Sequence, residues 1–123
     1  MSRVAFIKGF FAQFHSLNNE LIEMFPEDPD FPTFKTFLGM LEKTNPTLVL
    51  KTFHENVSEK FAREIESKDE SFFMNYVASE YDNETVDIVD KMRTYWKTLS
   101  PESKDCLWKY LFVLKELCGR AMA

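Results

Sequence analysis

The sequence predicts an all-α fold: a single helical domain over residues 1–123, built as a bundle of five or six helices with a buried C-terminal helix. Apolar residues recur at helical spacing along several stretches, and no strand-like alternation extends beyond a few residues. Prolines and helix-capping residues separate these stretches. With 123 residues, of which 45% are hydrophobic, the chain is long enough for one core, and disorder is disfavoured.

The first helix is expected over about residues 2–24. Asn18 falls near the middle of its apolar face. A buried amide must find a partner or lower the stability, so we expect Asn18 to be a structural hydrogen-bonding residue. The apolar face comprises Val4, Ile7, Phe10, Phe11, Phe14, Leu17, Leu21, Ile22 and Phe25.

Residues 25–32 are the first predicted loop, because their three prolines cannot continue a helix. A second helix follows over about residues 32–43, and Gly39 either weakens it or permits close packing. The expected inner stripe of this helix is Phe34, Phe37, Leu38 and Leu41.

Asn45 as N-cap and Pro46 as first helical residue predict the start of a third helix. From Val49 to Ile65 its apolar residues repeat every four positions, a spacing that drifts by about 40° per step around a straight helix. We therefore expect a bend near residues 56–58. The alternative is that Ser58 starts a new helix.

The second half of the chain begins with a polar break at residues 68–71. A short apolar cluster follows, and the sequence does not determine its secondary structure. A fifth helix is expected over about residues 84–99, and Ser100 with Pro101 separates it from the final helix. The apolar cluster comprises Phe72, Phe73, Tyr76, Val77 and Tyr81.

The final helix is expected from Ser100 to Gly119. Ser100 is a good N-cap, Pro101 suits the first helical position, and Gly119 is a natural stop.

Apolar side chains cover roughly two-thirds of the circumference of this final helix. Such a helix must be enclosed by the rest of the chain or by a partner. Trp108, Tyr110 and Phe112 are therefore the candidate partner-binding residues. The alternative is that they form only the core of this chain.

The formal net charge of −5 argues against binding to a nucleic-acid backbone, which needs clustered Lys and Arg. A nucleic-acid-associated protein remains an alternative. That alternative requires a contiguous basic face built from Arg3, Lys8, Lys35, Lys51 or Arg93.

Residues for catalysis, metals or cofactors are sparse. Cys106 and Cys118 lie 12 residues apart on one predicted helix, roughly 18 Å along its axis, which is too far for a disulfide. The chain has no Cys-x-x-Cys pair and no phosphate-binding glycine loop. We therefore expect no catalytic residue, no metal site and no cofactor. His15 is expected at the edge of the apolar face of the first helix.

A second alternative is a small ligand-binding protein or enzyme with an aromatic-lined cavity near His54. A His–carboxylate pair formed with Glu55 would then supply acid–base chemistry. The three glycines and 13 phenylalanines of the chain are otherwise explained by packing and capping.

Two stretches carry a resemblance to a known group of proteins. One is Lys-Asp-Glu-Ser-Phe-Phe at residues 68–73, and the other lies within residues 95–111, with Tyr-Trp-Lys, Leu-Ser-Pro-Glu and Leu-Trp-Lys-Tyr-Leu in order. The chain resembles small helical proteins encoded by large nucleocytoplasmic DNA viruses of algae and protists. The resemblance covers mainly residues 68 to 115. It implies a viral, intracellular setting and implies no activity.

The leading functional hypothesis is a non-catalytic helical protein-interaction module of a large DNA virus. It would act in the host cytoplasm of the infected cell or as a virion component. Its partner would be another protein or a second copy of the chain, with no nucleic acid and no membrane span. Its mechanism would be burial of aromatic and aliphatic side chains, with an acidic exterior for solubility.

Overall fold

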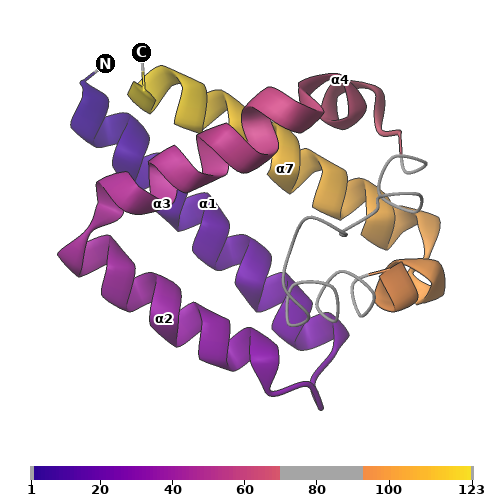
Figure 1. Cartoon of the computed structure of the whole chain (residues 1–123). Coiled ribbons are helices and arrows are strands. Elements are labelled where there is room, and N and C mark those ends of the chain that lie inside the picture. Colours follow the sequence, from indigo (N-terminus) through magenta and orange to yellow (C-terminus); the bar gives the residue numbers. More distant parts are fainter. Residues whose placement is uncertain (1, 70–92, 123) are drawn as a thin grey trace.

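The computed structural model describes residues 2–69 and 93–122, and Figure 1 shows how they are arranged. Its elements are α1 (Arg3–Met24), α2 (Asp30–Thr44), α3 (Pro46–Phe53), a π-helical turn η1 (His54–Ser58), α4 (Glu59–Ser67) and α7 (Pro101–Met122). Residues 93–98 are also helical. These described ranges contain no strand, so the predicted all-α fold is confirmed. The predicted apolar cluster at residues 72–81 and the start of the fifth helix lie outside them.

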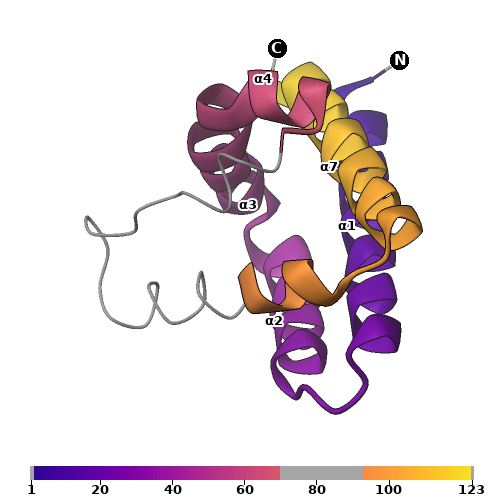
Figure 2. The ribbon, with the colours of Figure 1, turned by 90° about the vertical axis from the view of Figure 1, so that its right-hand side faces the viewer.

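The helices form two layers. Figure 2 shows α1 and α7 in one layer and α2 and α3 in the other. α1 and α7 run in opposite directions, which brings the two chain ends together (Figure 1). There the Arg3 side chain donates a hydrogen bond from Nε to the carbonyl of Ala121 (2.9 Å).

The start and end of α1 follow the sequence signals. The Oγ of Ser2 accepts a hydrogen bond from the backbone N–H of Ala5, as expected of an N-cap. The helix ends at Met24, ahead of Pro26. α2 begins at Asp30, two residues earlier than predicted, and α3 is capped by the side chain of Asn45 as predicted.

A π-helical turn, η1, lies where the bend was predicted. A π-helical turn replaces the α-helical turn between His54 and Ser58, and the N–H of Glu59 bonds to the carbonyl of His54. A π turn holds more residues than an α turn, so each residue rotates less about the helix axis. The turn therefore reduces the drift of the apolar residues, which repeat every four positions, around the helix. The α-helix α4 begins at Glu59, directly after Ser58, but Ser58 has helical backbone angles and makes no capping hydrogen bond, so the chain does not break there.

The break after α4 is a left-handed residue. Lys68 has φ 55°, and the N–H of Asp69 bonds to the carbonyl of Glu64. This arrangement satisfies helix carbonyls that would otherwise lack a partner. The polar break predicted at residues 68–71 therefore begins where it was expected.

The final helix starts as predicted but does not stop at Gly119. The N–H of Ser103 bonds to the Oγ of Ser100 (3.1 Å), which confirms the N-cap. Gly119 keeps a right-handed backbone, and α7 continues to Met122. The predicted stop is wrong because the next turn is held by tertiary contacts: Ala121 is fully buried and its carbonyl binds Arg3.

The core is built around aromatic rings. Phe10 is fully buried and makes edge-to-face contacts with Phe11, Phe14 and Phe53, at centroid distances of 5.5, 5.7 and 5.3 Å. Such aromatic pairs contribute beyond the area that they bury. The same core encloses α7, whose buried residues are Leu107, Trp108, Leu114, Cys118 and Ala121. A largely buried C-terminal helix was predicted and is confirmed.

Asn18 departs from its predicted role. It is only 2% exposed, yet its amide nitrogen Nδ2 has no hydrogen-bond partner in the described part of the chain. The expectation of a satisfied structural hydrogen bond at this nitrogen is therefore wrong. An unpaired buried donor lowers stability.

A polar contact fixes the loop after α1. The Tyr95 hydroxyl donates to Oδ2 of the buried Asp28, and the N–H of Asp30 donates to Oδ1 (2.9 Å). The Tyr95 ring also stacks on Phe25, with centroids 4.0 Å apart. The loop is thereby tied to the helical residues 93–98.

Tyr95→Phe is expected to lower the free energy of unfolding by about 1–2 kcal/mol, because it keeps the stacked ring and leaves a buried carboxylate one donor short. Urea denaturation measures this change. The matched control is Tyr110→Phe, since the half-buried Tyr110 hydroxyl has no hydrogen-bond partner in the described ranges. An equal loss in both variants would contradict the role given to the Asp28 contact.

Candidate functional site

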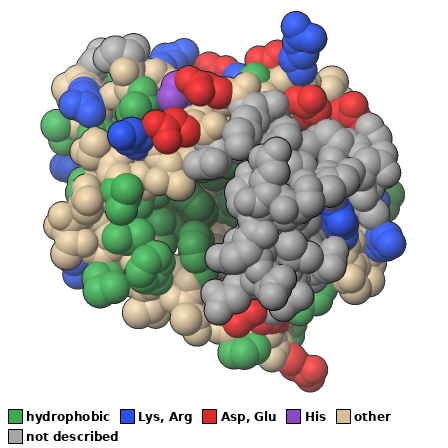
Figure 3. Space-filling view, in the orientation of Figure 1, with side chains coloured by type: hydrophobic (Ala, Val, Ile, Leu, Met, Phe, Trp, Pro, Cys, Tyr) green, Lys and Arg blue, Asp and Glu red, His purple; other side chains and the backbone are tan. Residues whose placement is uncertain are grey.

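The outer side of α2 exposes large apolar side chains. Phe34, Phe37 and Met40 lie at helical spacing and are all exposed, Phe37 by 50%. Thr33, Leu41 and Thr44 border them, so this stripe carries no charge. We call these six residues the α2 face. Figure 3 shows a group of hydrophobic side chains at the left of the face that it displays, in the region where α2 and α3 lie in Figure 1.

The opposite side of α2 is tied to α1 by polar contacts. His15 Nε2 and Glu42 Oε1 lie 2.9 Å apart, and Lys35 Nζ donates to Asn19 Oδ1 (2.7 Å). These contacts set the rotation of α2, which turns Phe37 away from the core. Phe34 and Phe37 were expected on the inner stripe, and that expectation is wrong; Leu38 is buried as predicted.

The α2 face is held rigidly. The ring of Phe34 lies 5.8 Å from that of Phe14, which in turn contacts Phe53 (6.2 Å). Phe34 is therefore attached directly to the core cluster, and Phe37 and Met40 follow it on the same regular helix. A rigid apolar surface loses little conformational freedom when it is covered.

The two ends of α2 carry opposite charges. Asp30 lies in the first turn and Lys43 in the last turn. This order also follows the helix dipole, whose positive end is N-terminal. The charge-free stripe is thus flanked by an acid at one end and a base at the other.

The three residues predicted for partner binding do not form one surface. Trp108 is 6% exposed and packs edge-to-face on Trp96 at 5.4 Å, so it belongs to the core. Tyr110 is half-buried, and this burial, together with the carboxylate of Glu20, raises the pKa of its hydroxyl. Phe112 is 43% exposed, with the ammonium of Lys115 lying 5.4 Å from its ring centroid.

A pocket of about 360 Å³ lies between η1–α4 and α7, beside His54. Nε2 of His54 lies 3.2 Å from Oε1 of Glu59, so the His–carboxylate pair forms with Glu59 and not with Glu55. The described lining contains no aromatic ring other than the imidazole, which differs from the predicted aromatic cavity. The lining residues are His54, Ser58, Glu59, Ala62, Lys115, Glu116, Gly119 and Arg120.

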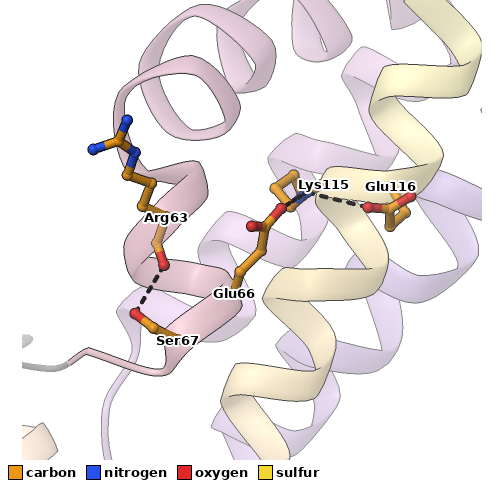
Figure 4. Close-up of polar contacts among 5 residues, drawn as sticks. All are labelled: Arg63, Glu66, Ser67, Lys115 and Glu116. Atoms are coloured by element: carbon orange, nitrogen blue, oxygen red, sulfur yellow. Dashed lines mark hydrogen bonds and ion pairs between the residues drawn. The ribbon is translucent and has the colours of Figure 1, made fainter.

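Lys115 joins α4 to α7 next to this pocket. Its Nζ lies 3.1 Å from Glu66 and 3.1 Å from Glu116, as Figure 4 shows. Burial opposes the charged form, but the hydrogen bonds to Glu116 and Glu66 prevail and raise the pKa of Lys115. Figure 4 also shows Ser67 bonded to the Arg63 carbonyl (2.8 Å) near the end of α4.

Both cysteines are free, and Cys118 is buried. Its Sγ donates to the carbonyl of Leu50 (3.3 Å), and burial raises the pKa of the thiol. A buried protonated thiol is a weak nucleophile. The structure therefore places Cys118 in a packing role between α7 and α3.

Within residues 2–69 and 93–122, no three His, Cys, Asp or Glu side chains gather in a way that could hold a metal ion. In the same residues, no helix combines the length and the apolarity needed to cross a membrane.

Two of the basic residues named for nucleic-acid binding, Arg3 and Lys35, lie near opposite ends of α1. Arg3 lies at its start, and Lys35 binds at Asn19 near its other end. Sixteen residues of helix separate these two points, about 24 Å at about 1.5 Å per residue.

In the described residues the fold is all-α, and α2 exposes three large apolar side chains along one face, while α7 exposes two, Phe112 and Val113. Comparison with protein families, with curated proteins and with solved structures finds no match for this chain. The α2 face and the pocket beside His54 are therefore the two candidate sites.

Proposed function

We propose that this chain is a non-catalytic helical interaction module that self-associates through its α2 face. The observation that carries the proposal is the exposed, charge-free stripe of Phe34, Phe37 and Met40 on a helix fixed to the core. Covering such side chains removes apolar area from water, which is the main driving force for association.

A second copy of the chain fits this face because the face is self-complementary. When two α2 helices pack in opposite directions, Asp30 of one copy meets Lys43 of the other, and the same pair forms at the second end. The dipoles of the two antiparallel helices then also point in opposite directions, which is the favourable arrangement for neighbouring dipoles. A two-fold contact of this kind is the commonest way in which soluble proteins associate.

Electrostatics restrict where two copies can meet. The net charge of −5 makes two copies repel each other over most of their surfaces. The repulsion is weakest where the surface carries no charge, and the α2 face meets this condition. The net negative charge thus favours the α2 face as the contact between two copies, and it also keeps the protein in solution.

The molar mass in solution tests the proposal. We expect sedimentation equilibrium to show a concentration-dependent rise from 14.5 kDa to twice that mass. Phe37→Glu should remain monomeric at every concentration, because it places a charge in the contact. The matched control is Phe112→Glu, which alters an equally large and similarly exposed ring on α7 and should still dimerise.

Charge exchange separates a contact between copies from unspecific aggregation. Lys43→Glu should weaken the dimer severalfold, since it sets two acids opposite each other at both ends. Adding Asp30→Lys to the same chain restores opposite charges and should restore the dimer. A monomeric wild-type chain, or a dimer lost in Phe112→Glu and kept in Phe37→Glu, would overturn the proposal.

The setting implied by the resemblance to viral proteins is likewise a proposal. We propose that the module acts inside the infected cell or in the virion. The support is that both cysteines are free and Cys118 is buried, which suits a reducing compartment. Mass spectrometry of purified virions and of infected-cell fractions tests it. Recovery only from the culture medium outside virions would contradict it.

A further inference from the structure

A groove of about 790 Å³ lies along the contact between α1 and α2, two helices that run beside each other in opposite directions (Figure 1). Its centre is Gly39, which follows Phe37 by two positions and therefore faces nearly the opposite side of α2 from the α2 face. On α2 the groove extends from Pro32 to Lys43, about 16 Å at about 1.5 Å per residue. We call it the α1–α2 groove, and its described lining is His15, Ile22, Pro32, Lys35, Thr36, Gly39, Met40 and Lys43.

The α1–α2 groove carries two lysines and no carboxylate in its described lining. Within residues 2–69 and 93–122 the Lys43 ammonium has no ion-pair or hydrogen-bond partner. Lys35 donates to the neutral amide oxygen of Asn19 (2.7 Å), which leaves its charge uncompensated. Glu42 lies outside the lining and is held by His15 (2.9 Å). On a chain of net charge −5, this groove attracts an acidic partner that most of the remaining surface repels.

Between the two lysines the groove is apolar and open. Ile22 of α1 and Met40 of α2 line it, and Met40 is 54% exposed. A Cβ placed on Gly39 would meet only Cε1 of His15, at 3.9 Å, which is an ordinary contact. Packing within this chain therefore does not require a glycine there. The missing side chain leaves room for the backbone of a partner to approach α2 closely.

We propose that the α1–α2 groove binds an acidic amphipathic helix of another protein. Lys35 and Lys43 lie eight residues apart on α2, or about 12 Å. Two carboxylates seven residues apart on a partner helix lie on one side of it, about 10.5 Å apart, within reach of both flexible lysine side chains. Apolar residues between these carboxylates would cover Ile22 and Met40. Docking of an amphipathic helix in a groove is a recurring mode of peptide recognition.

Fluorescence anisotropy with a labelled synthetic peptide and the whole chain tests this inference. The probe is a helical peptide of alanine, leucine and glutamine with two glutamates seven positions apart and leucines between them on the same side. We expect a dissociation constant on the order of 100 μM at low salt, and weaker binding in added sodium chloride. A peptide of the same composition with its glutamates nine positions apart, on opposite sides of the helix, should bind about five times more weakly.

The same titration also separates an acidic helix from nucleic acid. A single-stranded oligothymidylate, which offers phosphates without an apolar helix face, should bind more weakly than the peptide probe. Absence of probe binding overturns the proposal. Equal binding of the two peptides, or tighter binding of the oligothymidylate, overturns it as well.

Charge reversal at Lys35 tests whether the probe occupies this groove. Lys35→Glu should weaken binding by about fivefold or more, because it sets an acid opposite an acid. The matched control is Lys51→Glu, which changes the net charge equally at an exposed lysine of α3 outside the groove and should bind like wild type. A probe with lysines in place of its two glutamates should bind Lys35→Glu more tightly than it binds wild type, a gain that misfolding cannot produce. Equal losses in Lys35→Glu and Lys51→Glu would overturn the assignment.

The binding of an acidic helix is independent of the proposed self-association. Lys43 is left unchanged in the variants because it also takes part in the proposed contact between copies. Phe37→Glu, which should prevent self-association, should still bind the probe like wild type, so either proposal can fail while the other stands. Loss of probe binding in Phe37→Glu would place the peptide on the α2 face and overturn the assignment to the groove.

Discussion

Phe10→Ala is expected to lower the free energy of unfolding by about 3–5 kcal/mol, the usual cost of deleting a buried phenylalanine ring. Phe10 is fully buried and contacts three other rings from α1 and α3. Small domains are stable by only about 5–15 kcal/mol, so the variant should be close to unfolding at 37 °C. Urea denaturation followed by circular dichroism measures the change.

Phe37→Ala is the matched control for Phe10→Ala. It deletes the same ring from a position that is 50% exposed, so its effect on the free energy of unfolding should stay below about 1 kcal/mol. Both variants are compared at a concentration where the chain is monomeric, because self-association would add to the apparent stability. If Phe37→Ala unfolds as readily as Phe10→Ala, the α2 face is part of the core and the proposed function loses its basis.

Asn18→Leu is expected to stabilise the chain by about 2–3 kcal/mol. Asn18 buries an amide whose nitrogen has no partner, and burying an unpaired amide costs about 1–3 kcal/mol. Leucine has the same branching at Cγ, removes that penalty and adds buried apolar area. The rise in the urea midpoint or the melting temperature measures the gain.

The neighbouring residue supplies the control for Asn18→Leu. Asn19→Leu makes the same chemical change at an exposed position, where it deletes only the hydrogen bond from Lys35. It should alter the free energy of unfolding by no more than about 0.5 kcal/mol. A loss of stability in Asn18→Leu would show that the amide is satisfied in solution or that the site has no room for leucine.

Helix boundaries could be predicted from the sequence wherever a local signal fixes them. Ser2, Asn45 and Ser100 act as N-caps through hydrogen bonds that depend only on residues nearby in the chain. A departure from the regular α-helix near residues 56–58 could also be predicted, because the apolar stripe of a four-residue repeat drifts around a straight helix. Gly119 failed as a stop signal since contacts between Ala121 and Arg3 hold the next turn, and these residues are far apart in the sequence.

The candidate site was harder to predict from the sequence. On a helical wheel Phe34 and Phe37 look like core residues. Which side of α2 faces inward depends on contacts between helices, such as those of His15 with Glu42 and of Lys35 with Asn19. Trp108 was correctly placed on a helix that must be enclosed, but the sequence does not say whether the enclosing atoms belong to this chain. The pocket at Gly119 depends on two segments about 60 residues apart, which no local pattern reveals.

The most direct test of the self-association proposal is to compare ¹H–¹⁵N NMR spectra of the chain in dilute and concentrated solution. We predict concentration-dependent shifts over Asp30–Thr44, with Phe34, Phe37 and Met40 among the largest, and unchanged signals along Pro101–Met122. The shifts should disappear in Phe37→Glu. Spectra that do not change with concentration, or that change along α7 and not along α2, would contradict the proposed interaction surface.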